Sequence, residues 1–218
     1  MLTVVCSKWG TQYGPEYVTR LRHMVERNLT LPHRFVCFTD DDRQVKAECL
    51  PIEPFWEGKP AAVLHQRRGT ISAGYPNLYL FRHDFPFPGR ILYLDLDVVI
   101  TGSLDDLCLK TGPFWAIKDW WAGNWNGSVT LFESGCCPEL WDDFPPADLA
   151  QLGNGQDLLS RYFPDGQAWP DEWVRSYKIH CQDGVPDHCR VVVFHGQPKP
   201  PDLAVDHPLR KLWDYDRD

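Results

Sequence analysis

The chain has 218 residues, of which 43% are hydrophobic and 24% are charged, and its formal net charge is −8. This length fits a single domain with a buried core, and the composition excludes an intrinsically disordered chain. The acidic balance argues against a nucleic-acid partner, because proteins that bind nucleic acids normally present a basic face.

The N-terminal sequence and the cysteines indicate an intracellular setting. The first residues turn polar too early for a signal peptide, and no apolar run approaches the ~20 residues that cross a bilayer. Eight cysteines occur without a Cys-x-x-Cys pair. His180-Cys181 and His188-Cys189 supply zinc-ligand residue types, but not at the usual spacing. We expect a cytoplasmic protein, free or peripheral to a membrane, without a transmembrane segment.

The first 52 residues predict the opening of a doubly wound α/β domain. Residues 3–6 and 34–38 are strand-like, and between them Pro15 begins a helix with apolar residues three and four positions apart. A third strand is expected over residues 47–52. Asp40 follows the second strand, where carboxylates commonly meet the ribose or base of a nucleotide. The alternative for Asp40 is a turn or a helix cap.

The central part of the chain carries the strongest chemical signal. Residues 91–94 form an apolar run that predicts a strand buried on both faces. Asp95 and Asp97 follow at its end, before a second apolar run at 98–100. Open α/β sheets bind ligands beyond the carboxyl ends of their strands. Two carboxylates there, without a basic neighbour, favour a Mg²⁺ or Mn²⁺ ion, which prefers oxygen ligands.

The remaining sequence alternates short strands and helices. Residues 53–74 are basic and irregular, as lids and substrate loops often are. Trp120, Trp121 and Trp125 either line a sugar-binding cleft or form a small packed core. Residues 201–218, rich in Pro and Asp, are expected to form a surface tail that follows a single domain. Further strands are expected at 114–117, 128–132 and 191–194, and short helices at 77–81, 104–107, 138–144 and 156–163.

Three features, in this order along the chain, resemble one family of enzymes. One strand ends in Asp95-x-Asp97, and a later one ends in His195-Gly196 with Lys199 three residues on. Together they resemble the glycogenin-like family of retaining sugar transferases, above all its small bacterial members. The resemblance implies a GT-A fold over residues 1–200, a single α/β domain with a mixed, mostly parallel sheet flanked by helices.

The resemblance also implies a metal centre and a diphosphate site. In that family two carboxylates and a later histidine hold Mn²⁺ or Mg²⁺, which here corresponds to Asp95, Asp97 and His195. A Gly-x-x-Lys-Pro segment lays its backbone and its lysine against the diphosphate of a nucleotide sugar. Gly196 and Lys199 reproduce that segment.

Five other residues receive expected roles. Ser7, Asp40 and Asn126 are assigned to binding of the nucleotide sugar, because Ser7 and Asp40 follow the first two strands and Asn126 begins a stretch similar to the family's Asn-Ser-Gly-Val. Gln156 and Asp157 are assigned to the reaction face, since Gln156-Asp157 resembles the end of the family's Asp-Gln-Asp motif.

The chain departs from the family pattern at two positions. Val193 stands three residues before the glycine, where the family has its metal-binding histidine. His195 lies two positions further along the same strand, and residues two apart share a face. Gly155 stands where the first aspartate of Asp-Gln-Asp would be, so any role of that aspartate is lost or passes to Asp157.

The implied function is metal-dependent transfer of a sugar from a nucleotide-diphosphate sugar, with UDP as the implied carrier and retention as the implied outcome. The acceptor would be a glycan, a lipid-linked glycan or a small molecule. Asp-x-Asp-x-Val also resembles haloacid-dehalogenase-type phosphatases, but those enzymes place the motif on their first strand. A non-catalytic nucleotide-sugar-binding protein is the third interpretation, given the two departures.

Overall fold

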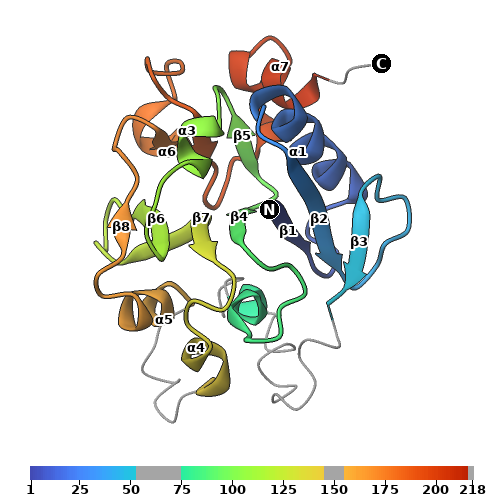
Figure 1. The fold of residues 1–218 in the computed structure, drawn as a ribbon. Coiled ribbons are helices and arrows are strands. Elements are labelled where there is room, and N and C mark those ends of the chain that lie inside the picture. The colour runs from blue at the N-terminus through green and yellow to red at the C-terminus, as the bar shows by residue number, and fades with distance from the viewer. Residues whose placement is uncertain (53–74, 145–154, 216–218) are drawn as a thin grey trace.

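The computed structural model describes residues 1–52, 75–144 and 155–215 (Figure 1). The basic segment 53–74, expected to form a lid or substrate loop, lies outside these residues. The strands are β1 (Leu2–Lys8), β2 (His33–Thr39), β3 (Glu48–Pro51), β4 (Arg90–Leu94), β5 (Val98–Ile100), β6 (Phe114–Lys118), β7 (Trp125–Glu133), β8 (Gln167–Ala168), β9 (Val174–Ser176) and β10 (Val191–Val193). The α-helices are α1 (Pro15–Asn28), α3 (Asp105–Cys108), α4 (Glu139–Asp142), α5 (Gly155–Tyr162), α6 (Tyr177–His180) and α7 (Pro208–Asp214), and the 3-10 helices are η2 (Tyr75–Phe81) and η4 (Pro200–Asp202).

Seven strands form the main sheet, in the order β3-β2-β1-β4-β7-β6-β8. Strands β3, β2, β1 and β4 run parallel to one another, whereas β7 is antiparallel to both β4 and β6. The parallel half follows from the strand–helix–strand opening of the chain, since parallel neighbours require a crossover connection. The predicted fold class, a mixed and mostly parallel sheet flanked by helices, is confirmed.

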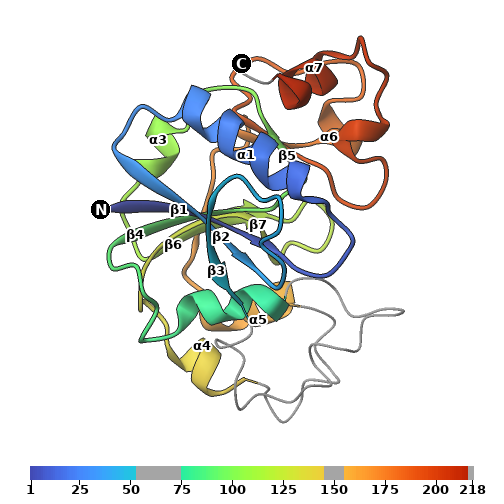
Figure 2. The same cartoon turned by 90° about the vertical axis from the view of Figure 1, so that its right-hand side faces the viewer.

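The central strand β4 is buried on both faces, as its continuous apolar run predicted. Leu92 and Leu94 face the core under α1, whereas Ile91 and Tyr93 face a second core. That second core contains residues of η2, α4 and α5, which lie on the other side of the sheet from α1 (Figure 2). Alternating side chains of one strand therefore join two helical layers into a single domain.

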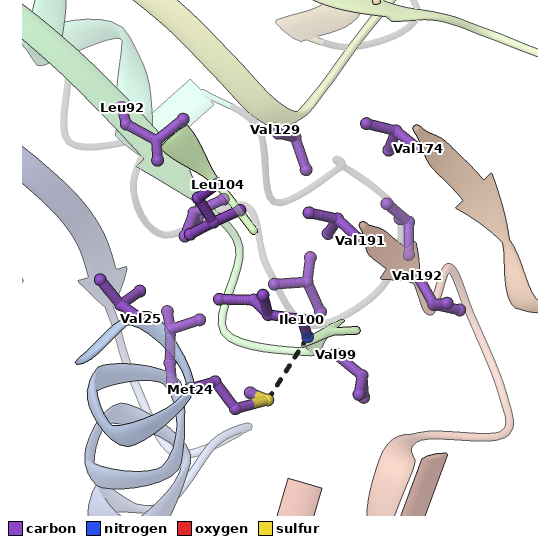
Figure 3. Close-up of a cluster of buried hydrophobic side chains, with 14 of the residues drawn as sticks. Met24, Val25, Leu92, Val99, Ile100, Leu104, Val129, Val174, Val191 and Val192 are labelled. Carbon is purple, nitrogen blue, oxygen red and sulfur yellow. Dashed lines mark hydrogen bonds between the residues drawn. The ribbon is translucent and has the colours of Figure 1, made fainter. Parts of the chain in front are cut away.

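A second, three-stranded sheet has the order β5-β10-β9. Its valines pack against α1 and against the end of β4, together with residues such as Leu104 and Val129 (Figure 3). The backbone N–H of Ile100 donates to Sδ of Met24 at 3.4 Å, so α1 contacts β5 directly. This small sheet matters for the site because it positions the residues that come after β10.

The segment expected to be a surface tail contains the packed helix α7, and this expectation is corrected. Pro208 occupies the first turn, and Nδ1 of His207 accepts a hydrogen bond from the N–H of Leu209 at 3.1 Å. Leu209 and Trp213, four residues apart on one face, are buried in the core under α1. Strands β8 and β9 and helix α6 were not predicted either. In the three described ranges, no helix combines the length and the apolar character that a bilayer crossing requires.

Candidate functional site

The predicted carboxylate pair lies where β4 ends and the chain turns into β5. The backbone N–H of Asp95 donates to the carbonyl of Ser128 at 2.9 Å, so the ladder with β7 continues one residue past β4. Leu96 is buried in the core and anchors the turn. Asp97 then directly precedes Val98, the first residue of β5.

The register of the small sheet brings the second motif to the same place. Val193 of β10 is paired with Val98 of β5 in antiparallel register, so the residues that follow β10 pass those that precede β5. Nζ of Lys199 forms an ion pair with Oδ2 of Asp97 and donates to the carbonyl oxygen of Phe194 at 3.1 Å. Residues about a hundred positions apart in sequence therefore meet at one point, as expected.

These side chains face a cavity of about 500 Å³ beyond the ends of β1 and β4. This is the position at which open α/β sheets bind ligands. Of the residues to which roles were assigned, those lining the cavity are Ser7, Asp95, Asp97, Asn126, Gln156, His195, Gly196 and Lys199. Aromatic and polar side chains such as Trp9, Gln12 and Tyr13 complete the wall.

Two expected residues lie elsewhere. Oδ2 of Asp40 accepts a hydrogen bond from the backbone N–H of Gly10 at 2.9 Å, and Asp40 is not part of the cavity wall. This contact fits the alternative to nucleotide binding, stabilisation of a turn, and nucleotide binding by Asp40 stays a prediction. Oδ1 of Asp157 accepts from Nδ2 of Asn124 at 2.9 Å, and Asp157 does not line the cavity either. Only its neighbour Gln156 reaches the wall.

The two carboxylates differ in their surroundings. Asp97 is 6% exposed, and the expectation that the carboxylates have no basic neighbour is corrected, because Lys199 forms an ion pair with Asp97. The hydroxyl of Tyr13 also donates to its Oδ2 at 2.8 Å. Asp95 accepts a hydrogen bond from the hydroxyl of Tyr93 at 2.8 Å and forms no ion pair among the described residues. Burial, with the negative charge of Asp97, raises the pKa of Asp95 to about 6.

Among the described residues, His195 contacts side chains other than the carboxylates. Its Nε2 lies 2.6 Å from the hydroxyl oxygen of Ser176, a buried residue of β9. The ring of Trp121 stands edge-on to the imidazole, with 4.8 Å between ring centroids. Burial, and next the positive charge of Lys178, lower the pKa of His195. The imidazole of His195 is therefore neutral near pH 7, but its Nε2 is already in contact with the hydroxyl of Ser176.

The donor set fits a divalent cation only in part. Asp95 and Asp97 offer oxygen ligands on one wall of the cavity, and the mutual repulsion that raises the pKa of Asp95 would be relieved by a cation. Within the described part of the chain, no three His, Cys, Asp or Glu side chains are grouped so that they could hold a metal ion. The two carboxylates thus fit, whereas His195 does not join them in this arrangement because it contacts Ser176. Metal binding stays a prediction.

Sequence reasoning missed three residues that shape the site. Tyr13 contributes a hydroxyl to Asp97, Tyr93 contributes one to Asp95, and Lys178 lies beside His195. Tyr93 belongs to the apolar run of β4, and its hydroxyl also accepts from Nδ2 of Asn77 at 2.6 Å. Neither Tyr13 nor Lys178 belongs to a recognisable motif, so their sequence context carried no signal.

The tryptophan segment contains one residue of a packed core and one exposed residue beside the cavity. Trp125 is buried and packs against Phe114, as in a packed core. Trp121 is 66% exposed and lies beside the cavity residue His195. Its position is fixed by a turn in which Oδ1 of Asp119 accepts hydrogen bonds from the N–H groups of Trp121 and Ala122, each at 2.9 Å. An indole held in solvent by an ordered loop is suited to contact a ligand.

Asp95→Asn is expected to stabilise the metal-free protein at neutral pH. A carboxyl with a raised pKa binds more protons in the folded than in the unfolded state, so the stability it contributes falls as pH rises from about 4 to about 6. Asparagine does not titrate, so it removes this loss, and its side-chain oxygen can still accept a hydrogen bond from the hydroxyl of Tyr93. We therefore expect the free energy of unfolding to rise by about 1 kcal/mol at pH 7.5 and to change little at pH 4.5. Urea unfolding in EDTA at both pH values measures it. Asp183→Asn, at an exposed position, is the control, and an equal gain at both pH values would contradict the assignment.

Solved glycosyltransferase structures share this fold. The galactosyltransferase LgtC, in complex with donor and acceptor sugar analogs, has a TM-score of 0.61 and 14% identity, covering 91% of this chain and 88% of that one. The glycosyltransferase GlyE of Streptococcus pneumoniae TIGR4 has a TM-score of 0.65 and 16% identity, over 98% of this chain and 60% of GlyE. The bifunctional glycosyltransferase WbbM has a TM-score of 0.62 and 13% identity, covering 91% of this chain and 46% of WbbM. No protein-family model matches the chain, and no curated protein matches it in sequence.

The chain has the fold of the GT-A-like glycosyltransferases. At 13–18% identity the similarity concerns the fold, and it does not distinguish the glycogenin-like family from other families with that fold.

Proposed function

We propose that the protein is a metal-dependent glycosyltransferase that takes a sugar from a nucleotide-diphosphate sugar, with UDP as the carrier and retention of configuration. The main support is the meeting of Asp95, Asp97, Gly196 and Lys199 around one cavity at the ligand-binding edge of a GT-A-like sheet. Neither phosphatase chemistry nor a purely binding role is favoured by a comparable observation. The Asp-x-Asp segment follows β4 rather than the first strand.

The residues of the cavity suit the separation of a sugar from a diphosphate. The leaving group gains negative charge, and Lys199 places a positive charge beside the cavity. A cation on Asp95 and Asp97 would supply Lewis-acid stabilisation of that charge. Asp97 forms an ion pair with Lys199, so the carboxylate would hold the ammonium group in place for a phosphate. We assign no general base, and Gln156 remains the proposed contact on the reaction face.

Binding of the donor is the first test. A thermal-shift panel of UDP-, GDP-, ADP-, CDP- and dTDP-sugars, each with and without Mn²⁺, is expected to show one preferred nucleotide and dependence on the metal. At a hundred times Kd a ligand stabilises by about 2.7 kcal/mol, which corresponds to roughly 5–10 °C in Tm for a domain of this size. Binding without transfer or hydrolysis of the sugar would point to the non-catalytic protein. Phosphate release from a generic aryl phosphate would point to the phosphatase.

Trp121 is proposed as part of the acceptor subsite. The exposed indole offers an apolar face that stacks on a pyranose ring, and it lies next to the cavity rather than in its wall. Trp121→Ala is therefore expected to raise KM for a glycan acceptor by about five- to tenfold and to leave Kd for the donor unchanged. Trp121→Phe, which keeps an aromatic face, should retain most of the acceptor affinity. A tenfold loss of donor binding in Trp121→Ala would contradict this placement.

A further inference from the structure

We propose that Lys178 is a second cation for the diphosphate of the donor, acting beside Lys199. This inference rests on the proposed function and adds to it a residue outside the Gly-x-x-Lys-Pro segment. Three independent features of the described residues carry it: the position of the ammonium group, its lack of a carboxylate partner, and the backbone that it faces.

The position of Lys178 follows from the pairing of two parallel strands. Ser176, the last residue of β9, is paired with Val193, the last residue of β10. The chain beyond β9 therefore runs beside the chain beyond β10, which brings Lys178 next to His195 and Gly196. A β-carbon added to Gly196 would stand only 3.0 Å from Nζ of Lys178. The ammonium group thus lies directly against the glycine at the start of the predicted diphosphate segment.

The charge on Lys178 is not compensated by an ion pair. Whereas Lys199 is paired with Asp97, no carboxylate in residues 1–52, 75–144 or 155–215 lies within ion-pair distance of the half-buried Lys178. The charged groups that affect the nearby imidazole of His195 are Lys178 and Lys199, which lower its pKa, and Asp119 and Asp97, which raise it. A partly buried ammonium group without a counter-ion is unfavourable, and an arriving anion would relieve it.

The backbone beside Lys178 also favours an anion. Gly196 has φ +68°, a left-handed conformation that glycine adopts without strain. None of the described residues accepts a hydrogen bond from the backbone N–H of Gly196 or of Gln197. Successive free N–H groups next to a left-handed residue form concave sites for phosphate oxygens. Gly196, Gln197 and Lys199 line the cavity, and Lys178, which is not part of the cavity wall, places its ammonium group beside Gly196.

Glycine at 196 is favoured mainly by the left-handed backbone. A side chain there would press on the ammonium group of Lys178 and would strain the left-handed backbone. With Lys178 included, two carboxylates and two ammonium groups lie in the cavity wall or next to it. When a divalent cation and a diphosphate bind together, the carboxylates would balance the cation and the ammonium groups would balance the diphosphate.

The test measures binding of nucleoside diphosphates to the full chain. Wild type, Lys178→Met and Lys178→Arg are titrated calorimetrically with UDP, GDP, ADP, CDP and dTDP in Mn²⁺. For the nucleotide that wild type binds, Lys178→Met is expected to raise Kd about tenfold or more, and Lys178→Arg is expected to restore most of the affinity. Kd of Lys178→Met should also rise less steeply with NaCl than that of wild type. Lys211→Met, on the exposed side of α7, is the matched control and should bind as wild type does.

The outcomes separate this inference from the function on which it rests. If wild type binds none of the five nucleotides, the proposed function and the inference both fail. If wild type binds one of them and Lys178→Met binds it equally well, only the role of Lys178 fails. A purely structural role would lower the Tm of Lys178→Met, whereas loss of an uncompensated charge should leave Tm equal or higher. A lower Tm with an unchanged salt dependence of Kd would therefore overturn the inference.

Discussion

Asp97→Asn is expected to lower kcat/KM for metal-dependent sugar transfer by at least a hundredfold while the protein stays folded. On the proposed function, the charge of Asp97 both attracts the cation and holds Lys199 at the cavity. Loss of that charge removes several kcal/mol of stabilisation from a transition state in which negative charge grows on the diphosphate, and about 2.7 kcal/mol already corresponds to a hundredfold. Donor turnover with varied Mn²⁺ measures the effect.

Asparagine is the informative substitution because the carboxylate is also structural. Asp97→Ala would leave the enclosed ammonium group of Lys199 without its partner, and breaking such a pair costs about 3–5 kcal/mol. An alanine variant could therefore lose activity through unfolding. The side-chain oxygen of asparagine can still accept from Tyr13 and Lys199, so this variant should lose less stability than the alanine variant and remain folded.

Asp40→Asn is the matched control for this experiment. Asp40 received a nucleotide-binding role from its place after the second strand, but its carboxylate accepts from Gly10 outside the cavity wall. Asparagine can accept the same bond, so turnover should stay within about twofold of wild type. Normal turnover by Asp97→Asn would refute the proposed function, and a large loss in Asp40→Asn would refute the placement of Asp40.

The parts of the site that depend on local pattern were predictable. The apolar run 91–94 marks a buried strand because an uninterrupted run suits a strand covered on both faces, and the carboxylates at its end then fall at the ligand-binding edge. Gly196 and Lys199 were assigned through the family's Gly-x-x-Lys-Pro segment, and both line the cavity. In each case the informative residues lie within a few positions of one another, so the sequence order itself carries the geometry.

The parts that depend on long-range register were not predictable. His195 was expected to join the carboxylates because alternate residues of one strand share a face. The structure instead places Ser176 beside its Nε2, and Ser176 belongs to β9, a strand of three residues with no periodic signal. The position of Lys178 depends on the same short strand. A residue's partner across a sheet depends on the pairing of strands distant in sequence, which hydrophobic pattern alone does not specify.

Helix α7 shows a different reason for a missed element. Its seven residues are too few for a clear helical period, and the surrounding Pro and Asp residues gave the segment the composition of a surface tail. Two apolar residues on one face nevertheless pack it against the core under α1, and the ion pair of Arg20 with Asp214 adds to the contact. Burial of one large aromatic side chain outweighs the polar average of the segment.

Trp213→Ala is accordingly expected to be among the most destabilising substitutions in the chain. Trp213 is 2% exposed, its ring centroid lies 5.2 Å from that of Tyr17, and the guanidinium of Arg20 stands 4.2 Å above it. Truncation of a buried tryptophan costs about 3–5 kcal/mol, which lowers Tm by roughly 10 °C for a domain of this size. Differential scanning calorimetry and urea unfolding measure the loss.

Trp213→Phe separates the packing from the polar contacts of this side chain. Nε1 of Trp213 donates to no partner among the described residues, so phenylalanine sacrifices no hydrogen bond and keeps an aromatic ring for Tyr17 and Arg20. Its loss should be less than half that of alanine. If residues 208–214 were a surface tail, both variants would stay within about 0.5 kcal/mol of wild type. Helix α7 also contacts β5, which directly follows Asp97. A large loss of stability in Trp213→Ala would therefore indicate that the C-terminal helix helps to position the carboxylates.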